Sequence, residues 1–134
     1  LGYFALSSEL ELCYNTALIM VLMHMISRAV GALMSTLTVS AHEGLLRAFT
    51  SAGAKGAAWI LLCIFALCAA GVILIAGIGG AAMVIAAIMA FFAFRRMAIK
   101  QFGGMSGDLA GFSIQMSELI MLTAYVFVSR AVNI

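Results

Sequence analysis

The sequence of 134 residues is 66% hydrophobic and 9% charged, with a formal net charge of +2, and its mean hydropathy is +1.21. Soluble domains carry about 25% charged residues, so this composition cannot cover a water-facing surface, and the small net charge argues against nucleic acid as a partner. Proline is absent and the short alternating strands of a membrane β-barrel are not visible, which favours long helices. We therefore expect an all-α, polytopic helical membrane protein embedded in a lipid bilayer.

Four apolar segments approach the length of about 20 residues that a helix needs to cross a bilayer. In chain order they are residues 12–39, 56–76, 80–96 and 108–129. Gly77, Gly79 and Gly80 mark a tight turn between the second and third segments. The third segment is short, and we expect it to return across the membrane as the second arm of a hairpin. The whole chain is expected to form a single membrane domain of about four transmembrane helices.

Basic residues gather in two connections, the one between the first two segments and the one between the last two. These two regions hold five of the seven Lys and Arg residues, namely Arg47, Lys55, Arg95, Arg96 and Lys100. The opposite ends carry Glu9, Glu11 and, among the basic residues, Arg130. Because basic residues favour the cytoplasmic side, we expect both connections to lie there.

Two charged residues fall inside the apolar segments, where a charge usually faces the protein interior or a watery cavity. Arg28 and Glu118 are each about ten residues from the expected cytoplasmic end, which corresponds to a depth of about 15 Å. We expect them to face one cavity and to pair; the alternative is that Arg28 extends to the interface and Glu118 is protonated in the core. His24 lies four residues before Arg28 on the same helix face, although a single His is more often a satisfied core residue.

The run FGGMSGDLAG at residues 102–111 leads directly into the fourth segment. Free N–H groups at a helix N-terminus favour anions, so the loop could contact phosphate together with the nearby basic residues. Asp108 could hold Mg²⁺ or simply cap the helix. Gly103, Gly107 and Gly111 also have the spacing of small residues that lets helices pack closely. Asp108, Gly111, Gln115 and Glu118 share one broad helix side, which favours a site over packing.

The stretch from Gly103 to Gly111, continued by Gln115, Ser117, Glu118 and Leu119, resembles the C-terminal signature of the cobalamin synthase family. These enzymes are adenosylcobinamide-GDP ribazoletransferases. Gln115 stands where the family pattern has its first acidic residue, whereas Glu118 keeps the second. Ser27 and Arg28, with residues 40–53, are also similar to the family.

The family has chains about twice as long, whose N-terminal half carries an aspartate-rich motif that binds Mg²⁺ and a diphosphate. Here Asp108 is the single aspartate, and the sequence begins with Leu1 and not with Met. We therefore expect the chain to be the C-terminal half of a longer enzyme. Its own N-terminal half, or further copies in a homo-oligomer, would then be a partner.

The resemblance implies a membrane-bound transferase of cobalamin biosynthesis that joins adenosylcobinamide-GDP to α-ribazole or its 5′-phosphate and releases GMP. Mg²⁺ would be the cofactor, and the site would face the cytoplasm from a prokaryotic inner membrane. The implied catalytic residues are Asp108 as the metal ligand, Arg28 facing phosphate charge, and Glu118 orienting Arg28 or accepting a proton. The implied substrate-binding residues are Gly103, Gly104, Ser106 and Gly107.

Two other classes of protein fit parts of the sequence. A transporter or channel component could use Arg28 and Glu118 to line an ion path, but no internal repeat of the kind common in transporters is visible. A non-catalytic structural subunit could use the glycine spacings for packing alone. Replacing Asp108 or Glu118 would then change assembly and not a reaction.

Overall fold

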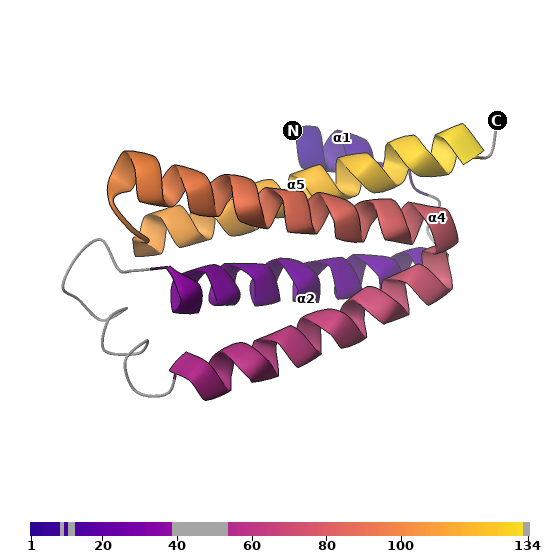
Figure 1. The fold of residues 1–134 in the computed structure, drawn as a ribbon. Helices are drawn as coiled ribbons and strands as arrows, with labels where there is room; N and C mark the ends of the chain where they lie inside the picture. The colour runs from indigo at the N-terminus through magenta and orange to yellow at the C-terminus, as the bar shows by residue number, and fades with distance from the viewer. Residues whose placement is uncertain (9, 11–12, 39–53, 133–134) are drawn as a thin grey trace.

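The computed structural model describes residues 1–8, 10, 13–38 and 54–132, and every regular element in these ranges is a helix. The helices are α1 (Gly2–Ser8), α2 (Tyr14–Leu37), α4 (Ala54–Phe102) and α5 (Gly107–Val132). The long helices lie side by side in a bundle, and α1 packs against α5 (Figure 1). The predicted all-α class is confirmed.

Three helices in the described part of the chain are long and apolar enough to cross a membrane, namely α2, α4 from Gly56 onward, and α5. The outer face of the bundle is strongly apolar. On α4, for example, Trp59, Leu67 and Leu74 are 72%, 77% and 86% exposed. Contiguous apolar surface of this kind is rare on soluble monomers but is satisfied by lipid, so the chain is a helical membrane protein, as predicted.

A sharp reversal at Gly77 divides α4 into two arms that run antiparallel (Figure 1). Gly77 has φ 55° and ψ −124°, a conformation that residues with a side chain rarely adopt. At Gly80 the arms meet so closely that a Cβ atom would collide with the carbonyl oxygen of Val72. The predicted hairpin is therefore present, and its second arm continues as helix beyond residue 96 to Phe102.

One end of the bundle collects the C-terminus of α2, both ends of α4 and the N-terminus of α5 (Figure 1). Arg95, Arg96 and Lys100 lie in the last two turns of α4 near this end, as the charge pattern predicts. Arg47 falls outside the described residues. Arg130 lies in the last turn of α5 at the opposite end.

The buried core holds α2 and α5 close together. At Gly31 of α2 an added Cβ atom would collide with the side chain of Ile114 in α5, so this small residue permits the close approach. A second buried cluster lies nearer the end that carries the glycine-rich turn, and consists of Met34, Ala98, Met105 and Leu109. Together these contacts fix the register of α2 against α5, which determines which polar side chains meet.

Candidate functional site

Glu118 of α5 is held by Ser27 of α2 in the middle of the bundle. The Ser27 hydroxyl donates a hydrogen bond of 2.6 Å to Oε1 of Glu118. Ser27 is fully buried, and the Glu118 side chain is 14% exposed. A hydrogen bond to a carboxylate is stronger than one between neutral groups, and this one orients the acid while its other oxygen, Oε2, is left for a further partner.

His24 lies beside the same carboxylate, one helical turn before Ser27. Its Nδ1 is 2.7 Å from the carbonyl oxygen of Met20; because that oxygen can only accept, Nδ1 carries the proton. Nε2 is 3.3 Å from the hydroxyl of Tyr3 in α1 and 3.9 Å from Oε2 of Glu118. Burial, with a smaller contribution from the Glu118 charge, raises the pKa of Tyr3, so its hydroxyl stays protonated; it donates to the sulfur of Met20 at 3.8 Å and lies next to the imidazole.

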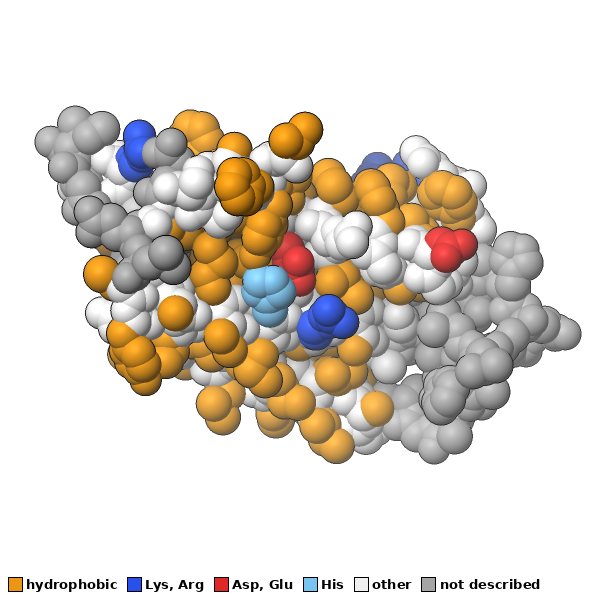
Figure 2. Space-filling view, turned by 180° about the vertical axis from the view of Figure 1, so that it is seen from behind, with side chains coloured by type: hydrophobic (Ala, Val, Ile, Leu, Met, Phe, Trp, Pro, Cys, Tyr) orange, Lys and Arg blue, Asp and Glu red, His pale blue; other side chains and the backbone are white. Residues whose placement is uncertain are grey.

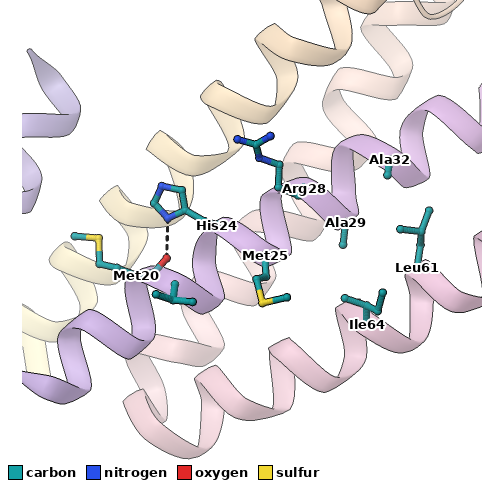
Figure 3. Close-up of a pocket in the computed structure, with 9 residues that line it drawn as sticks. Met20, His24, Met25, Arg28, Ala29, Ala32, Leu61 and Ile64 are labelled. Atoms are coloured by element: carbon teal, nitrogen blue, oxygen red, sulfur yellow. Dashed lines mark hydrogen bonds between the residues drawn. The ribbon is translucent and has the colours of Figure 1, made fainter. Parts of the chain in front are cut away.

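Arg28 does not pair with Glu118 in the described part of the chain, which corrects the predicted ion pair. Ser27 and His24 occupy the positions next to the carboxylate instead. Figure 3 shows that His24 and Arg28 nevertheless extend from the same side of α2. Because Ser27, the neighbour of Arg28, contacts Glu118, the polar groups lie at one level of the bundle as expected, although Arg28 itself has no ion pair with Glu118. His24, for its part, is 46% exposed and is not a core residue.

A groove of about 720 Å³ runs between α2 and the first arm of α4 (Figure 3). Its walls are almost entirely apolar, and His24 and Arg28 supply its polar edge. The lining residues are Met20, Val21, His24, Met25, Arg28, Ala29, Ala32, Leu61 and Ile64. Figure 2 shows histidine, acidic and basic side chains gathered within an otherwise apolar face. We call Tyr3, His24, Ser27, Arg28 and Glu118 the inner cluster.

The glycine-rich turn forms the link between α4 and α5. Gly103 and Gly104 have φ values of 67° and 151°, which favour glycine, and the Gly104 N–H donates to the carbonyl oxygen of Ala98 at 3.1 Å. Ser106 caps α5, since its hydroxyl accepts from the Leu109 N–H at 3.3 Å. The Ala110 N–H donates to the carbonyl oxygen of Ser106 at 3.0 Å, so three N–H groups are used within the chain. This leaves fewer for a phosphate than the sequence suggests.

Asp108 is exposed in the first turn of α5 and is not the capping residue, so the capping alternative for this carboxylate is wrong. The packing alternative for the glycines also lacks support among the described residues. A Cβ atom added at Gly103, Gly107 or Gly111 would find nothing within 4 Å. These positions are open to a ligand or a partner, whereas Gly104 is buried. We call Gly103, Gly104, Ser106, Gly107 and Asp108 the outer site.

The outer site and the inner cluster are distinct places. Asp108 and Glu118 are ten residues apart on one continuous helix, which separates them by about 15 Å along its axis. Their side chains cannot contact the same phosphoryl group directly. The structure therefore brings Arg28 and Glu118 to one region but does not bring Asp108 to them.

A magnesium ion would find an incomplete set of ligands here. The described residues contain no group of three or more His, Cys, Asp or Glu side chains that could hold a metal. Mg²⁺ often uses one or two carboxylates and takes its other ligands from water and substrate phosphates. The exposed Asp108 carboxylate fits as one such ligand and does not form a site by itself.

The profile of the cobalamin-5-phosphate synthase (CobS) family matches residues 1–126, which is nearly the whole chain. The chain belongs to this family. Membership confirms the resemblance seen in the sequence and places the protein among the enzymes of cobalamin synthesis, which favours an enzyme over a transporter or a structural subunit. No curated protein and no solved structure matches the chain.

Two members of the inner cluster were not singled out from the sequence as site residues. Ser27 had a usable signal, because it precedes Arg28 in a pair that is similar to the family. Tyr3 had none, since α1 is only seven residues long and nothing in its sequence shows that it packs beside His24.

Proposed function

We propose that the protein transfers the adenosylcobinamide phosphate group from adenosylcobinamide-GDP to α-ribazole or its 5′-phosphate, with release of GMP. Family membership supports a role in cobalamin synthesis. The observation that carries the proposal further is the inner cluster, in which a carboxylate, an imidazole and a guanidinium lie within a membrane-spanning apolar bundle. Such groups inside a membrane are costly and usually serve function.

In the proposed reaction a ribose hydroxyl of the acceptor attacks the phosphorus that is bonded to adenosylcobinamide, and a 5′-phosphate, where the acceptor carries one, takes no part in the bond changes. A new P–O bond forms, and the bond from this phosphorus to the bridging oxygen of GMP breaks. GMP leaves with the electron pair, and an attacking hydroxyl loses its proton to a base. Catalysis of such transfers depends mainly on positioning and on stabilising charge.

The outer site is assigned to the donor diphosphate. Its exposed Asp108 would be one ligand of Mg²⁺, which when bound neutralises phosphate charge, and the glycine positions leave room for the phosphates. Arg95, Arg96 and Lys100 line a neighbouring surface of α4 and add positive charge near this end. Because these groups lie where basic residues collect, we place the opening on the cytoplasmic side of a prokaryotic inner membrane.

The inner cluster is assigned to the acceptor. Arg28 has no ion pair among the described residues and can bind an anionic group, and Glu118 has one oxygen that is not engaged by Ser27. That oxygen can accept a hydrogen bond, or a proton, from a hydroxyl of the acceptor. Since Glu118 is about 15 Å from Asp108 along α5, the acceptor must extend from the inner cluster towards the outer site.

The test is reconstitution of the purified protein in lipid nanodiscs with adenosylcobinamide-GDP, α-ribazole and Mg²⁺, followed by measurement of GMP. We expect GMP and the cobamide product in equal amounts, and loss of both when Mg²⁺ is chelated. Asp108→Asn should lower turnover at least about 100-fold, whereas Gln101→Ala, an exposed change at the same end, should not. If Asp108→Asn left Mg²⁺-dependent turnover unchanged, the metal role of this carboxylate would be lost.

A further inference from the structure

We propose that the groove between α2 and the first arm of α4 binds the acceptor nucleoside, with the apolar base between the helices and the sugar end against Arg28 and His24. The inference rests on the proposed function for the identity of the acceptor. It adds a binding place for a planar, apolar aromatic base attached to a sugar.

The size and lining of the groove fit this ligand. Its volume is about 720 Å³, within the range of about 300–1,000 Å³ that is usual for small-molecule sites. Met20 and Met25 from α2 and Ile64 from α4 contribute flexible and branched apolar walls. Methionine sulfur makes favourable contacts with aromatic rings, so a dimethylated benzimidazole is well matched to these walls.

The polar edge fits the other end of the ligand. Arg28 and His24 lie along one side of the groove (Figure 3), and Arg28 has no ion pair with Glu118. The Glu118 carboxylate is already engaged by Ser27 at 2.6 Å. A guanidinium that lies within a membrane-spanning segment needs a counter-charge or water, and a 5′-phosphate on the acceptor would supply this charge with bidentate geometry.

The donor fits the groove less well. A corrinoid ring with its amide side chains is much larger and more polar than a benzimidazole, whereas the groove wall has few polar atoms apart from Arg28 and His24. The diphosphate of the donor is assigned to the outer site. A lipid acyl chain would match the apolar wall but not its polar edge, and the experiment separates these occupants.

The experiment measures the dissociation constant of α-ribazole for the protein in nanodiscs by equilibrium dialysis, without donor or turnover. Ile64→Phe narrows the groove from α4, and Ile60→Phe, one turn earlier, is the matched control because Ile60 is exposed outside the groove. Ala32→Phe and Ala17→Phe repeat the comparison on α2. We expect each groove variant to weaken α-ribazole binding at least about tenfold and each control to change it less than about twofold.

Arg28→Gln tests the polar edge. It should weaken binding of α-ribazole 5′-phosphate at least about tenfold, because it removes a charge-assisted contact, and should affect the unphosphorylated nucleoside much less. If Arg28→Gln bound α-ribazole 5′-phosphate as tightly as the wild-type protein does, this part of the inference would be overturned.

Three results would overturn the whole inference. The first is no binding of α-ribazole by the wild-type protein, and the second is equal binding of α-ribazole by the groove variants and the control variants. The third is that the groove variants weaken the binding of adenosylcobinamide-GDP and leave that of α-ribazole unchanged. The last two would indicate a lipid-filled groove and a donor site, respectively. Failure of the proposed function is seen separately, as absence of GMP release. A protein that binds α-ribazole in the groove without releasing GMP would retain the inference and lose the reaction.

Discussion

The hydroxyl of Ser27 in α2 donates a hydrogen bond of 2.6 Å to the carboxylate of Glu118 in α5. The contact joins residues that are 91 positions apart in the sequence and lies one turn from the close approach of Gly31 to Ile114. It fixes an acidic side chain inside a membrane-spanning bundle and leaves Arg28 without an ion pair in the described part of the chain. This arrangement has consequences for stability that can be measured.

Ser27→Ala should lower the free energy of unfolding by about 1–2 kcal/mol, because the Glu118 carboxyl loses a buried donor. The matched control is Ser117→Ala, since Ser117 is equally buried but, among the described residues, bonds to the carbonyl oxygen of Ile114 in its own helix. Reversible unfolding in mixed micelles would measure both. Equal losses for the two variants would mean that the contact between the helices adds no stability.

Tyr3→Phe should loosen α1 from the bundle, because the hydroxyl that reaches His24 at 3.3 Å is removed. The free energy of local opening of α1 should fall by about 1 kcal/mol. Hydrogen exchange of residues 2–8 would show faster exchange in this variant than in the wild type. Tyr14→Phe, a change at an exposed tyrosine, should leave hydrogen exchange in α1 unchanged. If Tyr14→Phe accelerated this exchange as much as Tyr3→Phe, the His24 contact would not be what holds α1.

Gly80→Ala should destabilise the hairpin of α4, because the added methyl group meets the backbone of Val72, which cannot move aside as a side chain can. We expect a loss of about 1–3 kcal/mol. Gly56→Ala provides the opposite case, since a Cβ atom there has nothing within 4 Å and alanine favours a helix. Thermal unfolding in nanodiscs would rank the two variants, and an equally stable Gly80→Ala protein would contradict the close approach.

Ser106→Ala and Asp108→Asn should separate stability from activity at the outer site. Ser106→Ala removes the cap of α5 and should cost about 0.5–2 kcal/mol. Asp108→Asn loses only a favourable charge near a helix N-terminus, worth about 0.3–1 kcal/mol, while it should abolish most Mg²⁺-dependent turnover. Unfolding and GMP release would be measured on both proteins. A reversed order of the stability losses would show that Asp108 has a capping role after all.

The sequence by itself determined the class of the protein, most of its helices and its family. Composition excluded a soluble protein because too few charged residues were present to cover a surface. Gly77 and Gly80 located the hairpin, since positive φ and close backbone approach both need glycine. The run from Gly103 to Gly111 carried the resemblance that the family match confirms.

Tertiary structure alone decided which polar groups meet. Depth in the membrane follows from residue number, so the sequence correctly grouped Arg28 with Glu118. Ser27 and Arg28, however, differ by only about 1.5 Å in depth and by about 100° around the helix. The rotation of α2, set by the close contact of Gly31 with Ile114, turns Ser27 towards the carboxylate and leaves Arg28 at the edge of the groove. Such a rotation depends on packing between segments far apart in the chain, which spacing within one helix cannot specify.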